Sequence, residues 1–443
     1  MRFAKRKWLW ALFVLFGLLA TALVVPFLVP LEGYIPGLTK RVSDAIGEPV
    51  SITDLRLQLL PTPRVAIIDL KLGRKNEVSI ERASIVPDLL LLVSSEVVLH
   101  EIRADGVRIK ASALELLKKL PQGGGSGGVL VRRIVLRHVN YEQRALRLPE
   151  FNVTVDLSAV PSATVVRVST DDGQFRATLA PQGDGRSHLT VSAHKWRLPI
   201  AAAPLLFDSL EADGVLQHGR LDFSQVNGKL YGGTLVGSAD TRWGGTWRIA
   251  GKAQLAGLEL VPLQAALGKP ARLSGRLSAH VTYSALASSG GQLGYALVLD
   301  APFEVAGGEW HGVDLSRIAE LPLGKLSEGG TTKFERLKAD LALRGKDVQL
   351  NKICVRSPSL TAAGNIAIAP DQALSGKLDV SVAKTKGFVS APVAVSGTTA
   401  DPSLSLTKAG VIGAVIGTVL LPGIGTSLGL SAGGRLEGKT ECQ

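Results

Sequence analysis

Apolar and polar residues alternate along most of this chain, and such alternation predicts β-strands with one apolar and one polar face. In the clearest run, residues 376–382, apolar and polar side chains take opposite faces: Leu378, Val380 and Val382 against Lys377, Asp379 and Ser381. Further segments repeat the pattern: 152–157, 188–193, 220–223, 338–343, 364–369 and 392–397. We therefore predict a mainly β protein with an elongated, largely antiparallel sheet and a few short helices.

The pattern leaves two arrangements open for the apolar face. A compact sandwich would bury the apolar faces of two sheets against each other. A long sheet with few helices to cover it would instead line an open groove. The side chains that would line this groove or core in the C-terminal strands are Ile366, Ile368, Leu378, Val380, Val382, Val393 and Val395.

An apolar run near the N-terminus predicts a membrane anchor. Residues 8–31 include 24 residues without a charge, which as a helix span about 36 Å, enough for a hydrocarbon core of about 30 Å. Four basic residues among positions 2–7 place the N-terminus in the cytoplasm and the rest across the membrane. A cleaved signal peptide is the alternative, but the apolar run continues past the possible cleavage site at Ala20–Ala22. We expect the helix to be retained.

The remaining segments divide the chain into five parts. Residues 1–31 are the basic stub and anchor, and residues 32–120 are a β region with short helices expected at 33–47 and 113–120. A glycine-rich linker at 121–128 precedes the main β body, 129–408. The apolar tail, 409–443, contains glycines four residues apart, which predicts two short helices or a re-entrant hairpin.

Composition and net charge narrow the kinds of molecule that the protein is expected to bind. The chain is 46% hydrophobic with only 5% aromatic residues, and it carries a net charge of +12. A basic protein binds nucleic acid or anionic lipid. The predicted anchor favours lipid, so we expect no nucleic-acid partner.

The two cysteines, Cys354 and Cys442, both fall on the outer side of the membrane in this topology. That compartment permits disulfides, and an even count fits one bridge, which would tie the tail back to a strand. Two free thiols are the alternative. No ligands neighbour the cysteines, so no metal site is expected.

Motifs that would indicate catalysis lack their structural setting. Residues 433–440, GGRLEGKT, fit the phosphate-loop pattern, but no helix fits in the three residues that follow. The G-x-S-x-G match around Ser126 lies in the predicted linker, and His100-Glu101 lacks the second histidine of a zinc protease. Trp243 and Trp247 could stack on a sugar, although packing explains such a pair more simply. We therefore expect no enzyme activity, cofactor, metal or catalytic residue.

The order of segments resembles the AsmA family of bacterial envelope proteins over nearly the whole chain. Residues 48–73 look like the family's opening strands, and 230–241, 255–268 and 272–285 are similar to its central repeat. Residues 334–369 and 391–407 look like its C-terminal block. The length is short for the family, and the glycine-rich tail departs from its pattern.

This resemblance implies a groove with an apolar interior and a role in phospholipid transport and outer-membrane integrity. The expected protein is a single-pass bacterial inner-membrane protein with a periplasmic body that shields acyl chains. The seven side chains of the C-terminal strands named above would then face lipid. The tail would meet the outer membrane or another envelope protein. The alternatives are an assembly factor for outer-membrane proteins and an envelope hydrolase.

Overall fold

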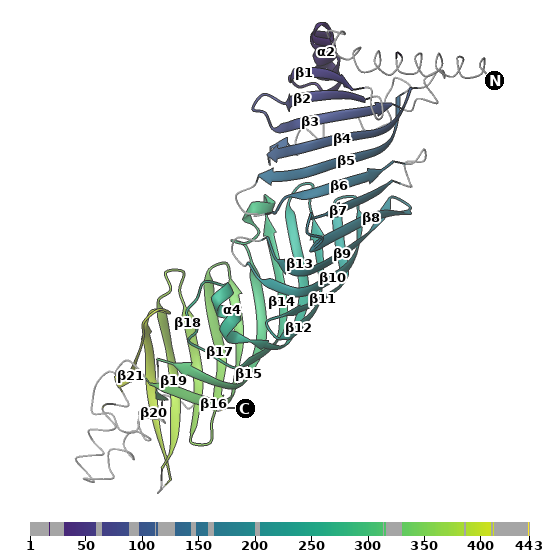
Figure 1. Ribbon diagram of the computed structural model, residues 1–443. Helices are drawn as coiled ribbons and strands as arrows, with labels where there is room; N and C mark the ends of the chain where they lie inside the picture. The colour runs from purple at the N-terminus through teal and green to yellow at the C-terminus, as the bar shows by residue number, and fades with distance from the viewer. Residues whose placement is uncertain are drawn as a thin grey trace, which may run out of the picture. The chain divides into compact units, whose positions relative to one another are not determined.

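The computed structural model describes residues 17, 31–58, 64–87, 97–110, 112–113, 129–142, 148–157, 164–199, 204–312, 314–315, 330–384, 387–408, 411 and 442 (Figure 1). None of the helices in these ranges is both long and apolar enough to cross a membrane. The predicted anchor falls almost wholly outside the described residues. So do the predicted linker, the helix expected at 113–120 except Ala113, and nearly all of the tail.

The described chain is mainly β, as the alternation predicts. The strands are β1 (Val50–Gln58), β2 (Arg64–Leu72), β3 (Val78–Pro87), β4 (Val97–Lys110), β5 (Val129–Glu142), β6 (Phe151–Asp156), β7 (Val165–Ser169), β8 (Phe175–Gly183), β9 (Arg186–Arg197), β10 (Leu206–Gln217) and β11 (Arg220–Leu230). They continue with β12 (Gly233–Arg242), β13 (Trp247–Glu259), β14 (Arg276–Ala287), β15 (Val298–His311), β16 (Thr331–Arg344), β17 (Asp347–Arg356), β18 (Leu360–Ile368), β19 (Leu374–Lys384), β20 (Gly387–Gly397) and β21 (Pro402–Leu406). The helical elements are η1 (Leu31–Tyr34), α2 (Ile35–Ile46), α4 (Leu260–Ala266) and η4 (Gly290–Gln292).

The 21 strands belong to one sheet. Strands β1 to β8 pair in sequence order, and so do β10 to β21, while β9 pairs with β10. The pairs within these two runs are antiparallel except β4 and β5, which are parallel. The sheet is therefore largely, but not purely, antiparallel.

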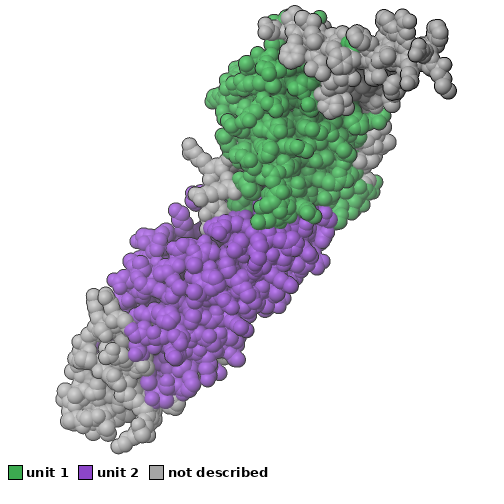
Figure 2. Space-filling view, viewed as in Figure 1, with its two compact units in different colours: residues 1–189, 199–201 green, residues 190–198, 202–443 purple. Residues whose placement is uncertain are grey.

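The chain forms two compact units (Figure 2). Unit 1 contains residues 1–189 and 199–201, and unit 2 contains residues 190–198 and 202–443. The division falls near β9 and not at the glycine-rich linker, 121–128, that the sequence offers as a boundary.

In unit 1, helix α2 packs at the β1 end of an apolar sheet face. A row of apolar side chains crosses six strands in register: Leu55, Ile67, Ala83, Ala104, Leu136 and Val153. Ile35 and Leu38 of α2 pack against this cluster. Pro36 suits the first turn of the helix, and Gly47 ends it in the left-handed conformation. The helix predicted at 33–47 is confirmed.

Seven strands contain a residue with positive φ in their interior, away from either end: Asp69, Gly106, His138, Lys195, Gly257, Gly307 and Lys352. In β17 this residue belongs to a bulge, because three residue steps from Leu350 to Ile353 face two steps on β18. Leu350 and Ile353 therefore lie on the same face of the sheet, although they are three positions apart in the sequence. The bulge thus absorbs one residue and keeps apolar side chains together.

Three of these left-handed residues have their backbone N–H bonded by a polar side chain of the next strand. His138 donates to Asn152 Oδ1 at 3.2 Å, Lys352 to Asn365 Oδ1 at 2.9 Å, and Gly257 to Ser278 Oγ at 3.1 Å. A bulge removes its residue from the regular ladder, so its N–H needs another acceptor. The same solution therefore recurs in both units.

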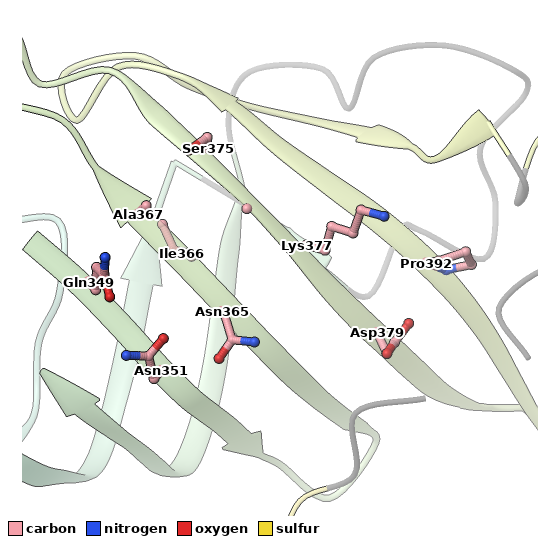
Figure 3. A pocket seen from close by; sticks show the side chains of 10 residues that line it. Gln349, Asn351, Asn365, Ile366, Ala367, Ser375, Lys377, Asp379 and Pro392 are labelled. Atoms are coloured by element: carbon pink, nitrogen blue, oxygen red, sulfur yellow. The ribbon is translucent and has the colours of Figure 1, made fainter. Parts of the chain in front are cut away.

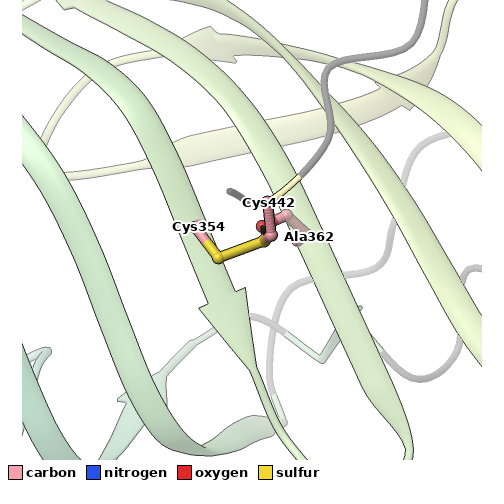
Figure 4. The surroundings of a disulfide bond; sticks show 3 residues. All are labelled: Cys354, Ala362 and Cys442. Atoms are coloured by element: carbon pink, nitrogen blue, oxygen red, sulfur yellow. Dashed lines mark hydrogen bonds between the residues drawn. A yellow bond between two sulfur atoms is a disulfide. The ribbon is translucent and has the colours of Figure 1, made fainter.

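A disulfide joins Cys354 of β17 to Cys442, with 5.2 Å between the Cα atoms (Figure 4). Cys354 faces Ala363 across the β17–β18 pair, whereas the neighbouring Val355 faces Ala362. Since successive residues alternate between faces, the bridge lies on the face opposite to Val355. It attaches the chain's C-terminal segment to the polar side of the sheet.

We expect loss of the bridge to loosen β17 and β18. Cys442→Ser removes a cross-link between positions 88 residues apart, which in the chain-entropy model is worth up to roughly 4 kcal/mol. Peptide-level hydrogen exchange should show faster exchange in both strands, and reductant should reproduce the effect in the wild type. Reductant should leave Cys442→Ser unchanged. Two freely alkylated thiols in the untreated protein would contradict the bridge.

Candidate functional site

One face of the sheet in unit 2, here called the apolar face, carries matched apolar side chains from strand to strand. One row crosses six strands in register: Val305, Leu337, Val355, Ala362, Val380 and Ala391. All but Leu337 are buried. Aliphatic side chains of this size fill the space over β15–β20 and form the largest core of the unit.

The seven C-terminal side chains singled out from the sequence lie together on this face. Five are buried, with 0–6% of their surface exposed: Leu378, Val380, Val382, Val393 and Val395. Ile366 is half-buried and packs against them, and Ile368 is half-buried beside Leu374 of β19. These strands thus form a closed core in the structure, and contact between these residues and lipid stays a prediction.

A short segment between β13 and β14, residues 260–275, covers part of this core. Leu260 and Leu263 of α4 pack into it, and Gln264 Nε2 holds the segment together by donating to the carbonyl oxygens of Leu260 and Leu273. Beyond the helix, the guanidinium of Arg272 donates to the carbonyl oxygen of Ala400, in the β20–β21 turn. The segment therefore links β14 to the last strands of the unit.

Strands β10–β14 differ because their part of the apolar face carries many small residues. Three neighbouring rows in register are Leu210, Gly228, Leu235, Leu255 and Ala279; Ala212, Val226, Gly237, Ala253 and Val281; and Gly214, Phe223, Ala239, Gly251 and Tyr283. Most of these side chains are only half-buried. In this region, here called the small-residue floor, the apolar face is therefore more exposed than over β15–β20, although aromatic rings lie over Gly214, Gly228 and Gly251.

The ring of Tyr283 lies directly over the backbone of Gly251 in the floor. A Cβ on Gly251 would lie 2.4 Å from the Tyr283 hydroxyl, so only glycine fits beneath the ring. The hydroxyl donates to the carbonyl oxygen of Ser238 at 3.3 Å. Burial raises the pKa of Tyr283, which keeps its hydroxyl protonated and able to donate.

Comparison with known proteins gives one result for this region. Residues 174–352 match the AsmA family. The central part of this chain is thus similar to the AsmA family. The match covers β8 to β16 and most of β17, including the whole small-residue floor. No curated protein and no solved structure matches the chain.

The matched segment contains a partly exposed apolar surface that alternation alone did not single out. Alternation identifies which residues share a face, but it does not show whether that face is covered. The size of the residues on this face indicates where it is less filled. Positions such as Gly237, Gly251 and Ala253 are small, whereas the C-terminal strands have Leu and Val on the same face. The change from large to small side chains marks where the filled core gives way to the floor.

On the opposite face of the sheet in unit 2, polar and charged side chains form ion pairs between neighbouring strands. Arg336 and Lys338 contact Glu304, Lys333 contacts Glu309, and nearby charges form further cross-strand ion pairs. A hollow of about 510 Å³ lies on this face over β17–β20, with Gln349 and Asn351 at its wall (Figure 3). Polar amides and charged side chains line this hollow, which suits a polar ligand better than an acyl chain.

A titratable cluster lies in unit 1, outside the matched segment. His138 Nδ1 is 2.6 Å from Asp105 Oδ1, and its Nε2 is 3.6 Å from Asp171 Oδ2. The hydrogen bond and charge of Asp105 raise the pKa of His138, and the same contact lowers the pKa of Asp105. No nucleophile joins the cluster in the described residues, so its visible role is to tie β4, β5 and the β7–β8 turn together.

The other motifs of interest have ordinary surroundings or fall outside the described residues. Glu101 pairs with Arg103 at 2.6 Å. The rings of Trp243 and Trp247 stack on each other with centroids 6.0 Å apart. Ser126 and residues 433–440 lie outside the described chain. Within the described part, no group of three or more His, Cys, Asp or Glu side chains could hold a metal.

The closed core over β15–β20 predicts that a charge there unfolds unit 2. Val380→Asp places an unpaired carboxylate at a site with 0% exposure, and we expect a loss of at least about 3 kcal/mol. Ser375→Asp, on the exposed face of the same strand, should change stability by less than about 0.5 kcal/mol. Urea unfolding of both variants provides the measurement. An unchanged midpoint for Val380→Asp would show that the core opens.

The His138 cluster predicts a pH-dependent contribution to stability. Because the folded pKa of His138 is raised, its contribution is full below 6.5 and declines as pH rises through the folded value. Because the pKa of Asp105 is lowered, its contribution is full above 3.8 and declines as pH falls through the folded value. The coupling between His138→Asn and Asp105→Asn in a double-mutant cycle should therefore be largest between these two values. A coupling energy that stays constant from acid to alkaline pH would refute this pH dependence.

Proposed function

We propose that this protein is a bacterial envelope protein that holds phospholipid acyl chains on its small-residue floor and conducts them between membranes. The observation that carries the proposal is the change in side-chain size along one continuous apolar face. Over β15–β20 the face is filled by Val, Leu and Phe. Over β10–β14 it carries more glycine and alanine and stays partly exposed, as a surface that receives a flexible apolar ligand must be.

The driving force would be the burial of apolar surface. An acyl chain laid on the floor loses contact with the bilayer but remains shielded from water, at about 25 cal/mol per Å² buried. The partly exposed apolar side chains of the floor would contact the acyl chain directly. No energy-coupling chemistry is needed for such passive shielding, and the match of residues 174–352 to the AsmA family supports an envelope role.

The anchor and the topology complete the proposal. Residues 8–31 would hold the protein in the inner membrane with the β body in the periplasm, as the uncharged run and the preceding basic residues suggest. The sheet would then stand between the two membranes, where it could support outer-membrane integrity. A folding outer-membrane polypeptide is the competing occupant of the same floor.

Photocrosslinking tests the floor residue by residue. A photoreactive amino acid at Val281 or Ala253 should form adducts with phospholipid in intact cells, since both side chains lie on the apolar face. The matched positions Thr282 and Gln254 are adjacent but face the other way, and they should form none. Mass spectrometry of the adducts identifies the occupant.

Ala253→Phe extends the test by filling the floor. We expect it to reduce lipid adducts from position 281 at least severalfold, while Gln254→Phe leaves them unchanged. Polypeptide adducts at positions 253 and 281 would favour the assembly-factor alternative. Equal labelling on both faces, or none on either, would reject the floor as a binding surface.

A further inference from the structure

The hairpin tip between β12 and β13, here called the Trp tip, has a nearly symmetric sequence, Arg-Trp-Gly-Gly-Thr-Trp-Arg, at residues 242–248. Arg242 and Arg248 face each other directly across the two strands. Trp243 and Trp247 lie just inside them, with their rings stacked 6.0 Å apart and 25° from parallel. Each strand end thus contributes one tryptophan and one arginine.

The two residue types take opposite faces of the hairpin. Trp247 alternates in step with Ile249, Gly251 and Ala253, so it belongs to the apolar face at the rim of the small-residue floor. Arg242 and Arg248 belong to the polar face. The tip is braced by its neighbours, because Trp247 lies against Gly290 and the Trp243 carbonyl lies close to Gly219.

The paired arginines are unusual for a sheet, because like charges directly opposite each other are destabilising. Asp240 pairs with Arg242 at 3.1 Å and also with Arg220, so its carboxylate is shared. Arg248 is exposed and has no ion-pair or hydrogen-bond partner among the described residues. Cross-strand from Arg248 stands Leu286, an apolar side chain that is 62% exposed.

This combination fits the surface of a bilayer. Tryptophan is enriched at the membrane–water interface, where its ring contacts the acyl boundary while its N–H remains hydrated. Arginine binds phosphate groups, and an anionic leaflet attracts basic residues near its surface. An exposed leucine beside an unpaired arginine adds apolar area that would enter the same boundary.

We infer that the Trp tip is a docking point for a membrane surface rich in anionic phospholipid. Arg242 and Arg248 would contact lipid phosphates, while Trp243, Trp247 and Leu286 would contact the boundary between headgroups and acyl chains. The inference stands on the geometry of the tip and does not require lipid on the floor. Its occupant is a bilayer surface, and an acidic protein is the alternative outcome of the test.

Vesicle capture by the full chain tests this docking. The protein is placed in phosphatidylcholine nanodiscs and mixed with separate vesicles of phosphatidylcholine, with or without phosphatidylglycerol. We expect capture of the anionic vesicles, weakened by salt, and a loss of roughly fivefold in affinity for Arg248→Gln. Lys252→Gln is the matched control: it removes an exposed, unpaired charge from the polar face of the same strand and should leave capture unchanged.

Tryptophan fluorescence provides a second readout that a merely electrostatic contact would not give. With brominated lipid in the added vesicles only, emission of the wild type should be quenched, and Trp247→Phe should lose a large part of that quenching. Circular dichroism checks that each variant remains folded.

Three results would overturn the inference. They are equal capture of neutral and anionic vesicles, equal losses for Arg248→Gln and Lys252→Gln, and capture without quenching. The last result, together with binding to an acidic polypeptide, would assign the tip to a protein partner. Loss of docking with intact lipid adducts at positions 253 and 281 would reject the tip alone and leave the proposed function standing.

Discussion

Most apolar side chains of a single-layer sheet have to share one face, because there is no second sheet to bury the other. This protein keeps most apolar side chains on one face along long strands, although several strands interrupt the regular alternation. The residues with positive φ within seven strands allow this, since a bulge takes up one residue at the point where the alternation would otherwise slip. Asn152 and Asn365 then satisfy the N–H groups that two of these bulges remove from the ladder.

The same face performs two different tasks within unit 2. Over β15–β20, branched and aromatic side chains pack into a buried core, and α4 with Arg272 ties this region to the last strands. Over β10–β14, more positions are glycine or alanine, and the face stays partly exposed. In the proposed function, the packed region would support the neighbouring floor, as loops alone would not.

Much of the architecture could be predicted from the sequence, because alternation is a local property. The segments 364–369, 376–382 and 392–397 lie within or nearly within β18, β19 and β20, and the helix at 33–47 contains α2. The parallel pairing of β4 with β5 could not be predicted, since it depends on which strands meet after a long connection. Helix α4 was also missed, because a seven-residue helix containing Pro262 has too few turns to show a helical period.

The candidate site was harder to predict than the strands. Leu378, Val380 and Val393 have the pattern of a groove lining, yet burial depends on what packs above a face, and alternation carries no information about that. Cys354 shows the same limit. Simple alternation from Leu350 would place it on the apolar face, but the bulge at Lys352 turns it to the polar face. Residue size along a row was the informative signal, and it requires the strand register to be known.

The bulges also bear on how such a sheet can change over evolutionary time. Deleting one residue from a regular strand turns every later side chain to the wrong face. Deleting Lys352 would instead merge the two halves of β17 into a regular strand whose apolar residues still share a face. Loss or gain of a single codon at such a position would alter the local bend of the strand without exchanging its inside and outside. The shape of the sheet could therefore drift among relatives by steps that leave the core composition untouched.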